Sequence, residues 1–264
     1  MIKVRAILEK EWHEATKNRT VLFTGILLPL IFTILPLVML ALTRNVTATD
    51  ADIRDAPPGM FANPAFAGLS DPEKLQAFLA SQLMVLFLLV PLAIPMTIAT
   101  YSVVGEKREK SLEPLLATPI TVAELLLGKA LAAALPGVFA AWLSFTLYAF
   151  GARFFVISDS VYTFIFSPTW ILAVALVAPL STVLAVSAGL MVSSRVNDPR
   201  AAEQLGMLII LPVLALLFGQ VAGVLFISIN LVLALAAALV LVDGAMIYFG
   251  TKLFQREVIL TRWT

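Results

Sequence analysis

Long apolar runs constrain this chain more than any other feature. A helix needs about 20 consecutive apolar residues to cross the hydrocarbon core of a bilayer. Six such stretches are present, at about 21–42, 82–104, 129–150, 170–192, 205–227 and 229–250. Hydrophobic residues make up 60% of the chain and charged residues 13%, which excludes an ordinary soluble domain. We therefore predict an all-α polytopic membrane protein, with six transmembrane helices in a single transmembrane domain over residues 1–264.

The distribution of lysine and arginine predicts the orientation of these spans. If the N-terminus is cytoplasmic, the four cytoplasmic segments carry five, four, two and three basic residues, hence 14 of the 18 in the chain. The outer segments carry the remaining four, which are Arg44, Arg54, Lys74 and Arg153. Cytoplasmic loops of membrane proteins are enriched in lysine and arginine. We therefore expect a protein of the cytoplasmic membrane with both termini, including the tail 251–264, in the cytoplasm.

Residues 1–20 predict an amphipathic helix that lies in the membrane interface. Its apolar stripe comprises Val4, Ile7, Leu8, Trp12 and Ala15, and its lysines face elsewhere. A helix with tryptophan on its apolar edge and basic residues on its polar face is typical of the boundary between lipid headgroups and acyl chains. Trp12 is thus a candidate interfacial anchor. The alternative is a solvated basic tail.

The segment 105–128 between spans 2 and 3 has an organisation that a plain connector does not need. Gly105 ends the apolar run, and the mixed charges of 106–110 predict the start of a short helix with an apolar leucine stripe. Thr118-Pro119 breaks it, because the residue before a proline disfavours helical geometry. Thr121 and Glu124 then predict a capping box that starts a second helix leading into span 3. Such a helix–break–helix unit at a membrane surface can receive a push from a soluble partner; the alternative is an ordinary cytosolic loop.

The same segment carries a family resemblance. The pattern Glu106-Lys-Arg-Glu109, Ser111-Leu-Glu113, Leu115-Leu116 and Pro119, followed by Gly128-Lys129, resembles the region after the second span of ABC-2 type transporter permeases. Lys10-Glu11-Trp12, the polar turn at 193–204 and the closing Phe254–Leu260 agree with this family in the expected order. One departure is Lys110-Ser111, where the family more often has Gly-Thr. The hydroxyl is kept and the glycine is lost.

This resemblance implies the membrane subunit of an ATP-driven exporter. Two permease subunits, as a homodimer or with a related chain, would form the pathway, and two separate ATP-binding subunits would dock beneath them. The resemblance implies that a coupling helix between spans 2 and 3 seats in the ATPase. Its candidate contact residues are Glu106, Arg108, Glu109, Ser111, Leu112, Glu113, Leu115, Leu116 and Pro119. We expect the leucine side chains to insert into the groove of the ATPase and the glutamates to form ion pairs with it at the rim of the contact.

ATP and magnesium are expected on the partner and not on this chain. Gly128-Lys129 is followed by Ala130, so the chain has no G-x-x-x-x-G-K-[ST] phosphate loop. The chain has no cysteine and a single histidine, His13, which disfavours a metal site. We therefore expect a non-catalytic subunit with no cofactor or metal of its own, in contact with membrane lipid and with no nucleic-acid partner.

Asp243 is the one charged residue in the interior of a span, away from its ends, by these boundaries. A carboxylate at membrane depth should face protein or water, because exposing it to lipid costs about 2.5–3.5 kcal/mol on insertion scales. It could contact a cation or polar substrate or form a gating pair, or it could make a purely structural pair with Lys252 or a neighbouring hydroxyl. An alternative function is therefore a secondary transporter, driven by an ion gradient, that uses Asp243. A single intramembrane acid and no internal repeat argue against this alternative.

Smaller features leave the cargo open. The Gly219-x-x-x-Gly223 spacing could allow close helix approach at a dimer contact. The prolines of spans 1, 2 and 4 could kink helices around a cavity or be tolerated bends. An intramembrane enzyme is disfavoured, since the chain contains no H-E-x-x-H motif and no paired carboxylates within a span. A drug-like, lipidic or ionic substrate is compatible with these spans.

Overall fold

The computed structural model describes residues 2–45, 64–108 and 120–253, and these residues form helices without any strand. The longer helices are α1 (Ile2–Lys17), α2 (Arg19–Thr43), α5 (Asp71–Met84), α6 (Val90–Arg108), α8 (Val122–Ala152), α11 (Ala178–Arg195), α13 (Leu211–Val221) and α14 (Ile229–Leu253). Short helices are α9 (Asp159–Ile165), α10 (Pro168–Leu172) and α12 (Pro199–Gly206). The 3₁₀ turns are η1 (Pro64–Phe66), η2 (Val85–Leu89) and η4 (Met207–Ile210), and a π turn, η3, covers Ala173–Val177.

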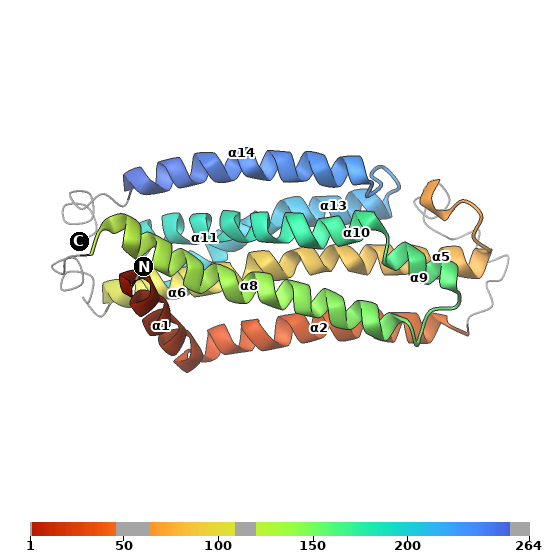
Figure 1. The fold of residues 1–264 in the computed structure, drawn as a ribbon, viewed down its shortest axis with the longest axis horizontal. Coiled ribbons are helices and arrows are strands. Elements are labelled where there is room, and N and C mark those ends of the chain that lie inside the picture. Colours follow the sequence, from red (N-terminus) through yellow and green to blue (C-terminus); the bar gives the residue numbers. More distant parts are fainter. Residues whose placement is uncertain (1, 46–63, 109–119, 254–264) are drawn as a thin grey trace.

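Six of these helical stretches within the described residues are long and apolar enough to cross a membrane, as predicted. They are Arg19–Thr43, Asp71–Arg108, Val122–Ala152, Asp159–Arg195, Pro199–Val221 and Ile229–Thr251. Several are longer than the apolar runs of the sequence, because the helices continue into polar residues at both ends. The spans run side by side in alternating directions and form an elongated bundle (Figure 1).

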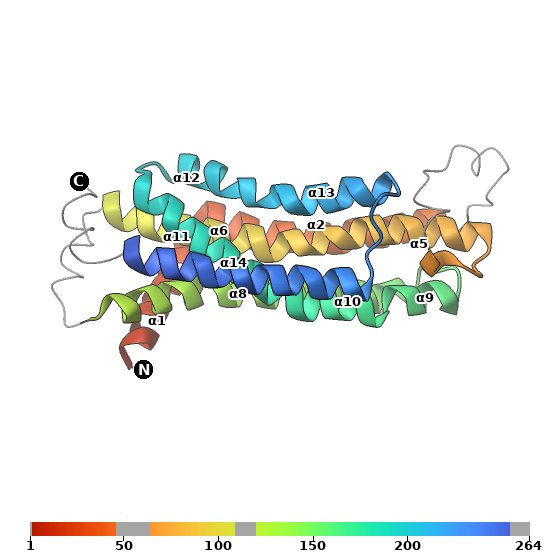
Figure 2. The same ribbon diagram turned by 90° about the horizontal axis from the view of Figure 1, so that it is seen from above.

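The span made of α5, η2 and α6 lies at the centre of the bundle. In its most apolar stretch 78% of the residues are buried, against 17% in the spans formed by α2 and by α14. Accordingly, α2 and α14 lie on opposite flanks in Figure 1, and α8 and α13 on opposite flanks in Figure 2. The core is aromatic around Phe87, whose ring packs against Phe145 and Tyr148. The exposed faces of the flanking helices are therefore available to lipid or to a second subunit.

Local capping sequences start two helices, because the pattern Ser70-Asp-Pro-Glu73 and the Thr121–Glu124 spacing each predict a capped helix start. Ser70 caps α5 and exchanges capping-box bonds with Glu73, which accepts from the Ser70 backbone N–H at 2.7 Å. Thr121 caps α8, and Glu124 accepts from the Thr121 backbone N–H at 2.9 Å. Each box satisfies backbone donors that a helix start would otherwise leave unpaired.

One local prediction is wrong, and one glycine motif has a local role that the sequence did not indicate. Residues 106–108 do not start a new helix after Gly105; they complete α6, because a glycine in an otherwise helical stretch costs only about 1 kcal/mol relative to alanine. The Gly219-x-x-x-Gly223 spacing does not lie on one continuous helix, because α13 ends at Val221, and its use at a dimer contact stays a prediction. It closes the end of α13, where Gly223 has a φ of 73° and the N–H of Val224 donates to the Gly219 carbonyl at 2.9 Å. A helix commonly ends on such a left-handed glycine.

Prolines inside the spans free backbone carbonyls that other helices then satisfy. Pro95 has no N–H for the carbonyl of Pro91, and the hydroxyl of Thr182 in α11 donates to that carbonyl at 3.1 Å. In the π turn η3, the carbonyl of Val174 accepts from the indole N–H of Trp142 in α8 at 3.1 Å. Because lipid supplies no donors, these bonds between helices make the bends tolerable.

Candidate functional site: a charged cluster at one end of the bundle

One end of the bundle carries most of the charged residues. The alternating spans bring α1, the last turn of α6 and the first turn of α8 to the same end (Figure 1). We call it the basic end, and by the distribution of lysine and arginine it is the predicted cytoplasmic end. The residues on either side of the segment 109–119 therefore lie next to the N-terminal helix.

The N-terminal helix α1 packs against the bundle through a face that overlaps the predicted apolar stripe only in part. Ile7 and Glu11 are its buried residues, at 5% and 3% exposed, whereas Trp12 is 41% exposed. The buried face is thus rotated relative to the predicted apolar stripe, and a carboxylate lies in its centre. The helix crosses the bundle at a steep angle and meets α2 at an elbow around Asn18, whose side chain caps α2 (Figure 1).

Gly128 allows α1 to lie directly against α8. A Cβ atom at position 128 would lie 2.7 Å from Cγ2 of Ile7, which is closer than carbon atoms approach one another in proteins. Any larger residue would therefore push the two helices apart. The next residue, Lys129, also contacts α1, because its ammonium group pairs with Glu11.

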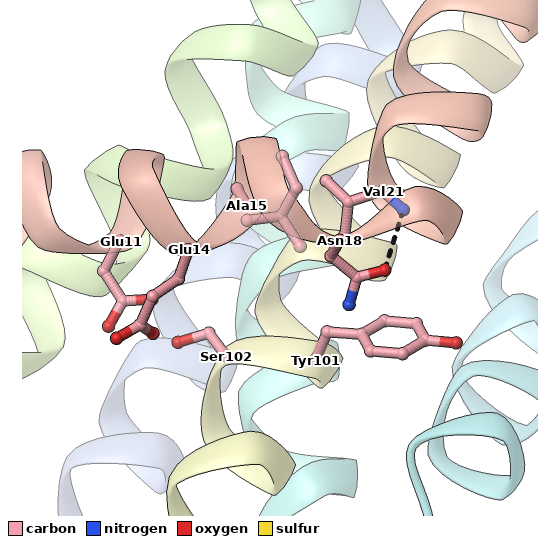
Figure 3. A pocket seen from close by; sticks show the side chains of 8 residues that line it. Glu11, Glu14, Ala15, Asn18, Val21, Tyr101 and Ser102 are labelled. Atoms are coloured by element: carbon pink, nitrogen blue, oxygen red, sulfur yellow. Dashed lines mark hydrogen bonds between the residues drawn. The ribbon is translucent and has the colours of Figure 1, made fainter.

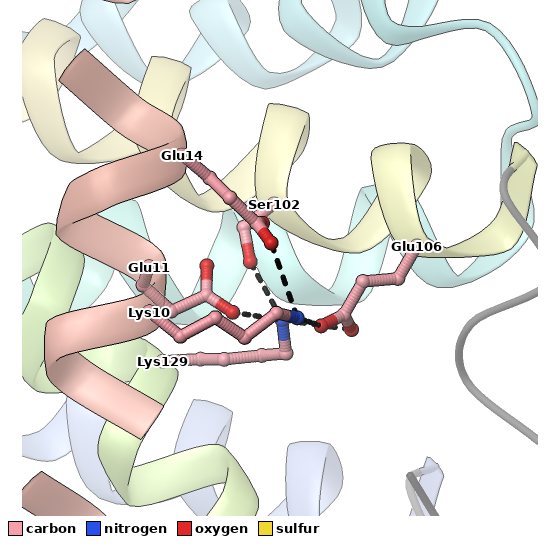
Figure 4. Close-up of polar contacts among 6 residues, drawn as sticks. All are labelled: Lys10, Glu11, Glu14, Ser102, Glu106 and Lys129. Atoms are coloured by element: carbon pink, nitrogen blue, oxygen red, sulfur yellow. Dashed lines mark hydrogen bonds and ion pairs between the residues drawn. The ribbon is translucent and has the colours of Figure 1, made fainter. Parts of the chain in front are cut away.

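Lys129 is the centre of a buried charged cluster (Figure 4). Its Nζ lies 2.6 Å from Glu11 Oε1 and 2.8 Å from Glu106 Oε2, and it donates to Ser102 Oγ at 2.7 Å. The side chains of Lys129, Glu11 and Glu106 are each 3% exposed. One ammonium group therefore joins α1, α6 and α8, which come from three separate parts of the sequence.

A second lysine completes the cluster from the solvent side. Lys10 Nζ lies 2.6 Å from Glu106 Oε1 and 3.5 Å from Glu14 Oε1. Partial burial lowers the pKa of Lys10, but the hydrogen bond to Glu106 and the nearby carboxylates more than offset this, so the pKa is raised overall. Lys10 thus stays charged at neutral pH. Glu106 is bound by both lysines, as a buried carboxylate must be if it remains ionised.

The end of α6 is also attached to α11. The ammonium group of Lys107 donates to the Ser194 carbonyl at 2.6 Å, in the last turn of α11, where helix carbonyls lack intrahelical partners. Ten residues earlier in α6, the Thr97 hydroxyl donates to Glu203 of α12 at 2.7 Å. The helix that leads into the segment 109–119 is therefore held on two sides.

Trp12 has a more specific role than lying at an interface. Its indole N–H donates to the carbonyl of Ala132 in α8 at 3.0 Å. This carbonyl has no ordinary helical partner, because residue 136, four positions later, is a proline within α8. The N-terminal helix thus satisfies the proline bend of α8, and the rest of the Trp12 ring stays exposed.

A small polar cavity lies beside the cluster, beneath the elbow, and Glu11 and Ser102 belong to both (Figure 3). Its volume is about 50 Å³, and Glu14, Asn18, Tyr101 and Ser102 are among its lining residues. That is room for a water molecule or two. In the described ranges no group of three or more His, Cys, Asp or Glu residues could hold a metal ion.

The structure describes two of the nine predicted coupling residues. Glu106 was predicted to form a pair at the rim of the ATPase contact. It is instead buried, and both of its carboxylate oxygens are bound by lysines of the cluster. Arg108 is exposed at the last position of α6. Glu109, Ser111, Leu112, Glu113, Leu115, Leu116 and Pro119 lie outside the described residues, and their coupling role stays a prediction.

Asp243 lies on the face of α14 that packs on α11 and is only 5% exposed. Neither carboxylate oxygen has a hydrogen-bond partner among the described residues. It is not the one ionisable residue within a long apolar helix, because Glu106 and Lys129 lie in the helices of spans 2 and 3. Those two are mutually paired, however, whereas Asp243 is a buried acid without such a pair in the described part of the chain.

Sequence reasoning missed Glu11, Lys129 and the packing role of Gly128. A signal was present, because Lys129 stands at the first position of a predicted span, where a lysine needs either water or a partner. Its partners could not be read from the sequence, since Glu11 is 118 positions away.

Together, the six spans, the steeply crossing N-terminal helix and the buried charged cluster that joins α1, α6 and α8 define a helical integral membrane protein. The profile of the family described as ABC-2 family transporter protein matches residues 5–255. The chain therefore belongs to this family, which comprises membrane permease subunits of ABC transporters. A search of curated proteins finds no significant match to the chain.

Proposed function

We propose that this chain is the permease subunit of an ATP-driven exporter in the cytoplasmic membrane. Separate ATP-binding subunits, two per transporter, dock on the segment 105–128 and supply the hydrolysis. A second copy of this chain or a related chain completes the pathway, and the chain itself is not catalytic. Membership of the ABC-2 family supports the ATP-driven mechanism over the alternative of an ion gradient.

The observation that carries this proposal is the bond across the base of the segment. Glu106, near the end of α6, and Lys129, in the second turn of α8, lie 2.8 Å apart and are both buried. The helices before and after the segment are thus joined to each other and, through Glu11 and Lys10, to α1. A force applied to the loop by a docked ATPase would move these three helices as one unit.

Asp243 supports the second candidate, a transporter that binds an ion or proton. A buried carboxylate without a described partner is costly and marks transport pathways in membrane proteins. Within the exporter, the same residue would contact a cationic or polar cargo. We therefore treat Asp243 as a residue of the pathway and not as evidence for a different energy source.

The test is a double substitution in the predicted docking stripe, Leu115→Asp with Leu116→Asp. We expect it to remove transport and to weaken copurification of the ATPase, because two charges replace the apolar docking contact, while the chain still inserts in the membrane. A matched control is Asn197→Asp with Gln204→Asp, which adds the same charge at two exposed positions at the basic end. If the leucine double variant transports as well as the wild type, the docking assignment is wrong.

A further inference from the structure

An apolar groove lies in the elbow between the N-terminal helix and the first span. Its volume is about 330 Å³, and its lining includes Trp12 and Thr16 of α1, Leu22, Gly25 and Ile26 of α2, and Pro136 of α8. Leu22 and Ile26 are 39% and 59% exposed, so the groove opens to the outside of the bundle. Because α2 and α8 are membrane spans, the groove faces the acyl-chain region of the leaflet at the basic end.

The chemistry at the mouth of the groove is cationic. Arg19 precedes Leu22 and Ile26 on the same face of α2, at the i, i+3, i+7 spacing of one helical stripe. Lys17, the last residue of α1, adds a second cation two positions away. Both side chains are exposed, and neither forms an ion pair or hydrogen bond with another residue that the structure describes.

The acidic residues of α1 do not cancel these two charges. Glu9, on the groove side, is bound by Arg5 at 2.8 Å. Glu14 lies 3.5 Å from Lys10 and lines the small polar cavity. Among the described residues, Lys17 and Arg19 therefore remain uncompensated beside an apolar groove that faces the acyl chains. This combination suits a ligand with an anionic head and a hydrocarbon tail.

We propose that this groove is a binding site for an anionic phospholipid. One acyl chain lies along Leu22, Gly25 and Ile26, and the phosphate is held at the elbow by Lys17 and Arg19. The exposed part of the Trp12 ring contacts the lipid at the boundary between head and tail, where amphipathic rings are most stable. The proposal depends on the chemistry of the groove and is independent of the transported cargo and of its direction.

Gly25 provides a variant that fills the groove without disturbing the fold. A Cβ atom at Gly25 would meet nothing within 4 Å, so Gly25→Leu places its side chain in the space that the acyl chain would occupy. Gly244→Leu is the matched control, because Gly244 is also a glycine within a span with nothing within 4 Å of an added Cβ. The head contact is tested separately by Lys17→Gln with Arg19→Gln, and Arg200→Gln removes an exposed cation elsewhere at the basic end.

The experiment measures quenching of Trp12 by brominated lipids. The full chain, with any subunits that copurify, is reconstituted in phosphatidylcholine vesicles that contain either brominated phosphatidylglycerol or brominated phosphatidylcholine at equal amounts. Subtracting the signal of a Trp12→Phe variant isolates Trp12. We expect clearly stronger quenching by phosphatidylglycerol in the wild type and in the Gly244→Leu and Arg200→Gln controls.

The two groove variants should act differently. Gly25→Leu is expected to lower quenching by both lipids, since it excludes the acyl chain. The Lys17→Gln, Arg19→Gln variant is expected to lower the preference for phosphatidylglycerol roughly ten-fold and to leave quenching by phosphatidylcholine unchanged. Equal quenching by both lipids in the wild type would overturn the proposal. A preference for phosphatidylglycerol that survives in both variants would also overturn it. If neither lipid quenches Trp12 and Gly25→Cys cross-links two copies of the chain, the groove is a contact between subunits and the proposal is wrong.

Discussion

Replacing Lys129 by methionine tests the charged cluster most sharply. Lys129→Met keeps an apolar stem of similar length but removes the ammonium group that lies 2.6 Å from Glu11 and 2.8 Å from Glu106. Glu106 retains Lys10 as a partner, whereas Glu11 loses its only described ion pair while remaining buried. Breaking a buried pair by removing one partner costs about 3–5 kcal/mol, because the other charge is left uncompensated.

The loss should be largely reversible by a second substitution. Glu11→Gln in the Lys129→Met background removes the stranded charge and leaves the Lys10–Glu106 pair intact. We expect a coupling energy of about 2–3 kcal/mol between the two positions in a double-mutant cycle. Thermal unfolding in a mild detergent measures it, with the melting temperature of Lys129→Met lower by roughly 6–20 °C and that of the double variant closer to the wild type.

A control separates this effect from the loss of any lysine. Lys74→Met breaks the half-exposed pair with Asp71, at 3.0 Å, at the opposite end of the bundle. That pair should contribute about 0–1 kcal/mol. The cluster does not hold the three helices together if Lys129→Met lowers the melting temperature no more than Lys74→Met does. The same conclusion follows if the stability losses of Lys129→Met and Glu11→Gln are additive.

Three other substitutions follow from the same geometry. Gly128→Leu should detach α1 from α8, since even a Cβ there would lie 2.7 Å from Ile7, and faster proteolysis of the N-terminal helix measures the effect. Trp12→Phe removes the N–H that donates to Ala132 at 3.0 Å and should lower the free energy of unfolding by about 1–3 kcal/mol, as chemical denaturation would detect. Asp243→Asn should raise the melting temperature, because it removes an unpaired buried charge, and should lower transport of a cationic cargo.

Each of these has an outcome that contradicts it. Gly105→Leu, at a helical glycine with nothing within 4 Å of an added Cβ, should not release α1, and equal proteolysis of both glycine variants would refute the contact. A Trp12→Phe protein as stable as the wild type would mean that the Ala132 carbonyl finds another donor. A melting temperature lowered by Asp243→Asn would mean that a partner holds this carboxylate in the assembled transporter.

The sequence predicts those features whose causes are local. Apolar runs predict the six spans, and the Ser70–Glu73 and Thr121–Glu124 spacings predict two helix starts, because each signal lies within a few residues. The ends of helices are less predictable. The charges after Gly105 predict a new helix start, but α6 continues to Arg108, and Lys107 in its last turn binds the end of α11.

The candidate site could not be predicted because its contacts are distant in sequence. Lys129 meets Glu11 across 118 positions and Lys10 meets Glu106 across 96, and no periodicity within either helix indicates which partner it takes. The stripe of α1 was predicted from apolar residues alone, so the buried face that contains Glu11 was missed. The bond between Trp12 and Ala132 depends on Pro136, whose effect is visible only when α1 lies beside α8.

The central claim is that this chain works with a separate ATPase, and copurification tests it most directly. The chain is solubilised from its native membrane in a mild detergent and captured, and the accompanying proteins are identified and assayed for ATP hydrolysis. The account predicts a copurifying subunit with a phosphate loop, whose ATPase activity depends on this chain. Pure chain without any ATPase, under conditions that keep known complexes together, would contradict it and favour an ion-driven transporter with Asp243 at its centre.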